Sequence, residues 1–560
     1  MPDSLVASTA NSQPANVPAP LLAPVSLGLL IPLALVSAVL LDFCFPVAGP
    51  AHAWQPCLAW IALFPLFWAL LNNRAAAHRR YLRRAALTAY LCGVLWYILN
   101  CYWIYRTMLL YGGSIPPIGA AGILVLFSAV LGLYFGLFGL LTAFFRRRFG
   151  LIPALILAPF LWTALDLAAA RITSVPWDQL GYSQIDNLVL NRLAPVTGVY
   201  GITFALVTAN ALIAFVILAP RRPQKIRAAA LAAVAFLCMA LLSLASPAPA
   251  PTSAYAVLLQ PNIQVSANSG WTGDEWHGDL PWLLHQDAQT CTPAYAGLPQ
   301  SGAEQTTPAE CAQNTQPPGV ILWPETASWF QSNDPRTRAA VAAVATTAHA
   351  PFIAGMTGQD STGTYNSALF VRADGSVAGR YDKIHLVPFG EYIPYRSAFF
   401  FAHQLTHQLE DLERGHTRNV FQAGGPTFGA FICYESIFAD EIRPFVLHGA
   451  QVLVNLSDDG WYGDTSAPWQ HLEMTRMRAV ENHRWLLLDT NNGVTTVIDP
   501  RGRVTLSAAR HQLTSLIARY GYESDLTFYT RHGDLFAYLC CLVAIAALAA
   551  GLLRKKAGSH

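Results

Sequence analysis

Charged side chains are scarce in this sequence. Lys, Arg, Asp and Glu make up 12% of the 560 residues, about half the share of roughly 25% that is usual in soluble domains. Apolar residues fill 53% of the chain, and the formal net charge is only +2. The basic residues lie in short clusters and form no long basic face, so the composition does not favour nucleic-acid binding. An integral membrane protein is the simplest interpretation, and the length indicates at least two domains.

The cysteines lack the spacing of metal ligands. The ten cysteines include no CxxC pair and no Cys/His cluster, so the sequence predicts no metal site. Most of them lie in or beside apolar runs, where a free thiol behaves as a small hydrophobic group. Cys291, Cys311 and Cys433 lie in the polar part of the chain, and only Cys433 is flanked by a motif.

Long apolar runs predict about eight transmembrane helices, because a bilayer core of roughly 30 Å needs about 20 apolar residues. The predicted spans are residues 21–41, 54–71, 85–105, 118–145, 151–168, 196–219, 228–246 and 535–553. The second is the weakest, because Gln55, Pro56 and Pro65 interrupt it. Residues 1–20 are rich in Pro, Ala and Ser and are expected to form a disordered lead. The first run has no basic flank and no convincing cleavage site, so we expect it to be retained.

Basic clusters predict the orientation of these spans. They occupy residues 74–84, 146–148, 221–227 and 554–556, after the second, fourth, sixth and eighth spans. Short loops rich in Lys and Arg stay in the cytoplasm, so both termini are expected there and the polar segment outside, which in a bacterium is the periplasm. The alternative is that the clusters are solvated caps without topological meaning. The predicted domains are residues 1–20, a seven-helix membrane domain over 21–249, an outer domain over 250–530, and the eighth helix with a cytoplasmic tail over 531–560.

The outer segment has the pattern of an α/β domain. Short apolar runs bounded by turn residues, such as YAVLLQ, GVILWPE, PFIAGMT, SALFVRA, GAFICYES and QVLVNLS, predict buried strands. Helical patterns lie between several of them, at residues 334–348 and 469–482, which favours a layered α/β fold. Residues 290–318 are polar and are interpreted as a surface insertion. Its Cys291 and Cys311 either form a disulfide, which an oxidising compartment permits, or remain unpaired.

Three residue types needed for acyl transfer through a thiol stand at predicted strand ends. They are Glu325 in VILWPET, Lys383 in RYDKIHLVPFGEY and Cys433 in FICYES. Taken singly, they have ordinary interpretations as a salt-bridge partner, a surface lysine and an inert buried cysteine. Taken together, a carboxylate can activate the thiol. A cation, assisted by the backbone N–H of Tyr434, can stabilise the oxyanion that forms during the reaction.

The motif order WPE, DKxHLVPFGEYxP and CYES resembles the carbon–nitrogen hydrolase, or nitrilase, superfamily. With the added membrane spans, the chain is most similar to the bacterial apolipoprotein N-acyltransferase family, from about residue 21 onward. The resemblance implies an α-β-β-α sandwich and a Glu325–Lys383–Cys433 triad. It also implies that Glu391 orients the lysine. Further supporting or substrate-binding residues that it implies are Tyr434, Glu435, Trp461 and Trp271, with Trp276 as the competing choice for the last. The family pattern has Asn then Asp where this chain has Asp458 and Asp459.

The resemblance implies a two-step reaction. Cys433 takes an acyl group from a phospholipid, and the thioester passes it to the α-amine of a diacylglyceryl-cysteine at the N-terminus of an apolipoprotein, with no cofactor. Both substrates are anchored in the bilayer, which explains the membrane spans. Loop aromatics such as Trp461, Tyr462 and Trp469 either dip toward lipid or pack in the core. The alternatives are a membrane-anchored nitrilase-type amidase and a transporter or lipid-binding scaffold with an inactive domain.

Overall fold

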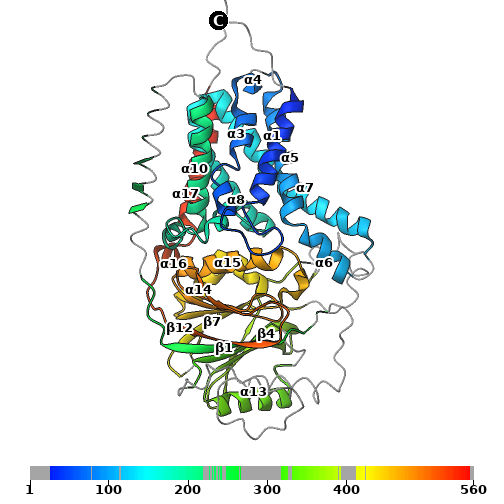
Figure 1. Ribbon diagram of the computed structural model, residues 1–560, viewed down its shortest axis with the longest axis vertical. Coiled ribbons are helices and arrows are strands. Elements are labelled where there is room, and N and C mark those ends of the chain that lie inside the picture. The colour runs from blue at the N-terminus through cyan, green and yellow to red at the C-terminus, as the bar shows by residue number, and fades with distance from the viewer. Residues whose placement is uncertain are drawn as a thin grey trace, which may run out of the picture.

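The computed structural model describes residues 26–76, 78–112, 115–218, 248–263, 317–325, 331–388, 390–392, 412–422 and 424–554, with residue 265 and single residues between 223 and 241. Figure 1 shows a helical region stacked on a domain of two sheets, with the C-terminal helix α17 returning beside α10 in the helical region.

Five helical segments of the described chain are long and apolar enough to cross a bilayer. They are α5 (Tyr81–Asn100), α7 (Pro117–Phe149), Leu151–Thr173, α10 (Val199–Leu218) and α17 (Leu535–Leu553). The third comprises α8 (Leu151–Ala168) and the π-helical turn η1 (Ala169–Thr173). A shorter apolar helix, α1 (Leu27–Asp42), precedes them. These helices confirm the membrane character expected from composition.

The predicted span over residues 54–71 is not one helix. It divides into α2 (Gln55–Leu58) and α3 (Phe64–Leu71), each with a proline in its first two positions. A proline is favourable in the first turn of a helix but breaks a helix that runs through it, so Pro56 and Pro65 each begin a new short helix. The predicted span over residues 228–246 lies mostly outside the described residues, and the total of eight spans stays a prediction.

Short helices complete the helical region. They are α4 (Asn73–Ala76), α6 (Trp103–Tyr111), η2 (Leu180–Gln184), η3 (Asn191–Leu193) and α9 (Ala194–Thr197). Of these, α6 lies at the edge facing the outer domain (Figure 1). This position matters for the candidate site, because α6 contacts one of the loops that shape it.

The domain that follows the membrane helices, called the outer domain here after its expected position, contains two six-stranded sheets. The first has the order β12-β1-β2-β3-β4-β5 and the second β11-β10-β9-β8-β7-β6. In the first, β1, β2 and β3 are parallel, and in the second β7, β8 and β9 are parallel. The first-sheet strands are β1 (Ala254–Gln260), β2 (Val320–Trp323), β3 (Phe352–Gln359), β4 (Thr364–Val371), β5 (Val377–Asp382) and β12 (Thr514–Tyr520). The second-sheet strands are β6 (Phe421–Gln422), β7 (Thr427–Ile432), β8 (Val452–Ser457), β9 (Trp485–Thr490), β10 (Thr496–Ile498) and β11 (Val504–Ser507).

Helices cover the outer face of each sheet, which gives four layers. Val257 of β1 packs in one cluster with Val341 and Val344 of α13 (Pro335–Ala348). The alternate residue Leu258 packs in the cluster shared with the second sheet. Because strand side chains alternate between faces, β1 is buried on both sides. On the second sheet, α14 (Ala439–Leu447) and α15 (Ala467–Asn482) form the layer nearest the membrane helices (Figure 1). This arrangement confirms the nitrilase-like α/β fold.

Helix α15 is the main contact between the outer domain and the helical region. Gln470 accepts a hydrogen bond from Trp177 Nε1 at 3.0 Å, and Glu481 Oε1 accepts one from the amide of Val199 at 2.9 Å. Arg171 adds ion pairs to Asp440 of α14 and to Asp534, which follows α16 (Phe528–His532). These polar contacts hold the layer of α14 and α15, which covers the second sheet, directly against the membrane helices.

Candidate active site

Glu325 leaves the end of β2 through Pro324, and its side chain is 6% exposed. A Cβ atom at Gly355 of the neighbouring β3 would stand 2.1 Å from the carbonyl oxygen of Pro324, so only glycine permits this close approach. Oε1 of Glu325 accepts hydrogen bonds from Lys383 Nζ at 3.0 Å and from Asn366 Nδ2 at 2.7 Å. Oε2 accepts one from the amide of Asp458 at 2.9 Å. Both oxygens are therefore fixed by donors.

Lys383 follows directly after β5 and is 1% exposed. Its Nζ donates to Glu325 and, at 2.8 Å, to Oε1 of Glu391. Oε2 of Glu391 accepts from the amide of Val387 at 2.7 Å, so the second carboxylate is itself anchored. Burial alone lowers the pKa of Lys383, but the two carboxylates outweigh it and hold the pKa well above its usual range. The lysine is thus a permanently charged bridge between two acids.

Cys433 begins the 3₁₀ turn η7 (Cys433–Ile437), directly after β7. Its backbone φ is 50°, in the left-handed region that costs a non-glycine residue about 1–3 kcal/mol. Burial raises the pKa of the thiol well above its usual range. The Glu325 carboxylate raises it further, whereas Lys383 acts in the opposite direction. The Glu325 carboxylate and the Lys383 ammonium group therefore both act electrostatically on this thiol.

Glu435, two residues after the thiol, links the two sheets. Its Oε1 accepts hydrogen bonds from the amides of Ile384 and His385 at 2.7 and 3.0 Å, and its Oε2 accepts one from Ile432 at 2.7 Å. Tyr381 OH also donates to it, at 2.8 Å. The segment after Lys383 is thereby fastened to the strand that carries Cys433. Burial raises the pKa of Glu435, while its amide donors lower it.

Two aromatic residues predicted beside the site face the helical region. Tyr434 is 9% exposed, and its hydroxyl donates to the carbonyl of Ser174 at 3.3 Å. Trp461 is 41% exposed and stacks edge-on against Tyr111 of α6, with ring centroids 5.0 Å apart. Tyr462 is buried against Trp103 and favours core packing. The other predicted positions, Trp271, Trp276, Cys291 and Cys311, lie outside the described residues.

Three polar residues in the site went unpredicted. Asn366 of β4 donates to both Glu325 and Glu391. Its signal was a single amide inside the apolar run YNSALF. Nδ1 of His471 on α15 lies 3.0 Å from the buried Asp459 carboxylate, and His471 Nε2 lies 3.2 Å from the carbonyl oxygen of Cys433. The QHLEM pattern gave no indication of this contact, because it depends on how α15 packs over β7.

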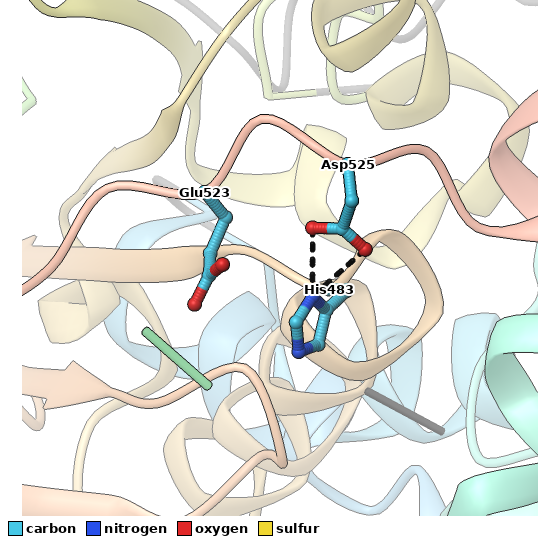
Figure 2. Close-up of side chains that lie close together, drawn as sticks. All are labelled: His483, Glu523 and Asp525. Carbon is cyan, nitrogen blue, oxygen red and sulfur yellow. Dashed lines mark hydrogen bonds and ion pairs between the residues drawn. The ribbon is translucent and has the colours of Figure 1, made fainter. Parts of the chain in front are cut away.

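Within the described part of the chain, one cluster has ligand atoms close enough to hold a metal ion. It comprises His483, Glu523 and Asp525, whose ligand atoms lie within 4.8 Å of one another (Figure 2). Nδ1 of His483 already contacts both oxygens of Asp525, at 3.0 and 3.1 Å, and Arg484 Nη1 stands 3.6 Å from the same carboxylate. Glu523 accepts from the amide of Ala250. Protein donors therefore satisfy these acids, and the cluster is better explained as an ion pair where the chain enters and leaves the outer domain.

Residues 296–520 match the carbon-nitrogen hydrolase family, and residues 37–212 match the apolipoprotein N-acyltransferase N-terminal domain. The fold and the site therefore define a membrane protein with a carbon–nitrogen hydrolase domain.

Curated relatives narrow this class. An apolipoprotein N-acyltransferase from Geobacter metallireducens is 31% identical over 541 residues, covering 94% of this chain and 96% of the relative. The apolipoprotein N-acyltransferase from Methylococcus capsulatus is also 31% identical, covering 94% of this chain and 97% of the relative. A solved amidase from Nesterenkonia sp. aligns at 15% identity with a TM-score of 0.35, covering 53% of this chain and 99% of the amidase. The chain belongs to the apolipoprotein N-acyltransferase family.

Proposed function

We propose that this protein transfers a fatty acyl chain from a phospholipid to the α-amine of the diacylglyceryl-cysteine at the N-terminus of apolipoproteins. Cys433 is the nucleophile, Glu325 the general base and acid, and Lys383 the oxyanion stabiliser. The single observation that carries these roles is the buried Lys383 amine, 3.0 Å from Glu325 and within electrostatic reach of Cys433. The family membership supports N-acylation of apolipoproteins, because the relatives described above are named for that activity.

In the first half-reaction, Glu325 takes the proton of the Cys433 thiol as sulfur attacks an ester carbonyl of the phospholipid. The new oxyanion lies against Lys383 and the amide of Tyr434, the second residue of η7, whose first amides have no partner within the turn. When the tetrahedral intermediate collapses, the C–O bond breaks and Glu325 returns the proton to the leaving alkoxide. The products are a lysophospholipid and a thioester on Cys433.

In the second half-reaction, the neutral amine of the lipoprotein attacks the thioester carbonyl and Glu325 takes the amine proton. The same cation stabilises the second oxyanion. Collapse breaks the C–S bond and forms the amide, and the thiolate regains its proton from Glu325. The lysophospholipid leaves before the lipoprotein attacks, so the acyl-enzyme separates the two steps and ping-pong kinetics are expected.

The proposal includes a multi-pass protein of the bacterial cytoplasmic membrane with its catalytic domain in the periplasm. The basic clusters at residues 74–84 and 146–148 support this orientation, since short basic loops remain cytoplasmic and both clusters stand at the ends of helical segments remote from the sheets. Contacts such as Trp177 to Gln470 keep the outer domain against the membrane helices. A thiol held there can reach ester groups at the bilayer surface.

Intact mass spectrometry after incubation with phospholipid alone tests the proposal. The wild type should gain the mass of one acyl chain, and neutral hydroxylamine should remove it because thioesters are labile to that reagent. Cys433→Ala should gain no mass, and Cys433→Ser should form no hydroxylamine-labile adduct.

The amidase alternative makes a different prediction in the same experiment. It expects no acyl adduct from phospholipid, even with the lipid shown to be accessible, and a water-dependent hydrolysis of small amides. That result would reject the phospholipid donor. Appearance of the adduct, followed by its loss only when a diacylglyceryl peptide is added, would support transfer to an amine.

A further inference from the structure

One turn connects both halves of the candidate site. Residues Asp458–Tyr462, called here the bridging turn, follow β8 and include the 3₁₀ turn η8 (Asp459–Tyr462). The amide of Asp458 donates to Glu325 at 2.9 Å. The next side chain, Asp459, is 1% exposed and accepts from Nδ1 of His471 at 3.0 Å. Asp458 of the turn therefore holds Glu325, and the next residue, Asp459, holds the buried imidazole of His471.

The imidazole continues this connection to the nucleophile. His471 is wholly buried, and its Nε2 lies 3.2 Å from the carbonyl oxygen of Cys433 and 2.7 Å from Ser436 Oγ. Nδ1 faces the Asp459 carboxylate, and Nε2 faces two oxygens, of which the Cys433 carbonyl only accepts hydrogen bonds. The side chain of His471 thus reaches from the bridging turn to the main chain at Cys433.

The position of that carbonyl matters because Cys433 has a left-handed backbone, with φ at 50°. Such a conformation persists only when the surroundings fix it. Two side chains meet the Cys433 carbonyl: His471 from α15 and, at 3.3 Å, Asn455 Nδ2 from β8. Holding this oxygen fixes the peptide plane after Cys433 and with it the direction of the thiol and of the Tyr434 amide.

We propose that His471, held by Asp459, is a positioning residue that fixes the main chain at Cys433 and aims the thiol at its base. It does not touch the reacting atoms. This inference rests on the proposed role of Cys433 as the nucleophile.

Two substitutions of His471 distinguish its contact with Asp459 from its contact with the Cys433 carbonyl. In His471→Asn, the amide nitrogen can take the place of Nδ1 and keep the Asp459 contact, but the side chain no longer reaches the Cys433 carbonyl, which is left with Asn455 alone. In His471→Gln, the longer amide can place an N–H where Nε2 was. We expect thioester formation from phospholipid in a single turnover to fall about 10- to 100-fold in His471→Asn. His471→Gln should recover at least part of that loss, and the KM for phospholipid should change less than twofold in both.

The matched control stands on the same helix. His483 caps α15 and pairs with Asp525 at 3.0 Å (Figure 2), twelve residues and therefore about 18 Å along the helix axis from His471. His483→Asn breaks a second His–Asp contact, in which the histidine is buried and Asp525 is 43% exposed, and asparagine tolerates its left-handed backbone. It should lower the apparent Tm no more than His471→Asn does, and leave the rate of thioester formation within twofold of wild type.

A second readout does not need a substrate. The rate at which iodoacetamide alkylates Cys433, followed by peptide mapping, should fall several-fold in His471→Asn and remain near the wild-type rate in His483→Asn. Should the wild type form no thioester, the proposed function fails, and the alkylation rates alone decide the positioning role. Equal alkylation and transfer rates in wild type and His471→Asn would overturn the inference, and so would equal slowing in both histidine variants.

Discussion

The first sheet brings charged side chains to the candidate site, whereas the second brings a thiol and the groups that hold its main chain. Glu325 and Lys383 follow β2 and β5 of the first sheet, and the charged groups satisfy one another at 3.0 Å. Cys433 follows β7 of the second sheet, and its carbonyl is met by His471 and Asn455. The first sheet thus contributes the charges of the site, and the second sheet fixes the position of the thiol.

The difference predicts two kinds of failure. A buried charge whose partner is removed costs several kcal/mol, so changes on the first sheet should affect catalysis and stability together. Changes around the thiol remove hydrogen bonds worth about 0.5–1.5 kcal/mol each, so they should affect rate more than stability. The variants below test this contrast, in order of decreasing effect.

Replacing Lys383 with Met should have the largest effect after loss of the thiol itself. It removes the oxyanion stabiliser, worth about 10²–10³ in rate, and leaves Glu325 and Glu391 facing each other without their cation. We expect thioester formation to fall at least 100-fold and the apparent Tm to drop, as measured by single-turnover mass spectrometry and thermal unfolding.

Arg380 provides the control for this variant, since it lies on the same strand and pairs with Asp360 at 2.9 Å near the surface. Arg380→Met should change the rate and Tm much less than Lys383→Met, because pairs open to solvent contribute only about 0–1 kcal/mol, and Arg380 and its partners Asp360 and Asp382 are 21%, 41% and 20% exposed. Similar losses of rate and Tm in both variants would show that any substitution near β5 is harmful. They would contradict the role of Lys383 as the oxyanion stabiliser.

Glu435→Gln tests the connection between the two sheets. The Glu435 carboxylate accepts hydrogen bonds from the amide of Ile384, which follows the first sheet, and from the amide of Ile432 in the second sheet. A glutamine would turn its N–H₂ group toward one of these two donors. Leaving a buried donor unsatisfied costs about 1–3 kcal/mol. We expect a fall in Tm with a roughly tenfold slower thioester formation. Glu441→Gln is the control, because Glu441 contacts the His385 ring but not these amides.

Much of the site could be predicted because it stands in short motifs at strand ends. Glu325, Lys383 and Glu391 fall in WPE and DKxHLVPFGEY, and the structure brings their side chains together within 3.0 Å. Six strands were predicted from apolar runs, since buried strands of a parallel sheet are almost wholly apolar. The end of β7 was predicted less well, because the backbone changes direction there. The strand stops at Ile432, and Cys433 already belongs to the 3₁₀ turn η7.

Contacts that depend on packing between distant segments could not be predicted. His471 meets Cys433 across 38 residues because α15 lies over the second sheet. No local pattern encodes that distance. The broken second span differs, because its prolines were visible and only their effect on helix continuity was underestimated. The positions of Trp271 and of the Cys291–Cys311 pair stay predictions.

Asp458→Asn should have the smallest effect, and its size depends on pH. Burial and the neighbouring Glu325 carboxylate raise the pKa of Asp458 from 3.8 to about 7. Between these values the folded protein retains a proton that the unfolded chain has lost, so the stability contributed by this proton is complete below about pH 4 and is lost as pH rises through 7. Asparagine carries no charge and can still accept from the amide of Gly460, as Asp458 Oδ1 does at 3.0 Å.

The Tm gain of Asp458→Asn over wild type should therefore be near zero at pH 4 and grow to about 2–4 °C for each kcal/mol recovered by pH 8. Thioester formation should stay within a few-fold of wild type, because the amide of residue 458 still donates to Glu325. Asp464→Asn, which removes a carboxylate 79% exposed in the following loop, should change Tm much less. A gain that is constant from pH 4 to 8 would mean that Asp458 ionises normally in the folded protein. The charge of Glu325 would then have no effect on Asp458, and the bridging turn would contribute to the site only by positioning its groups.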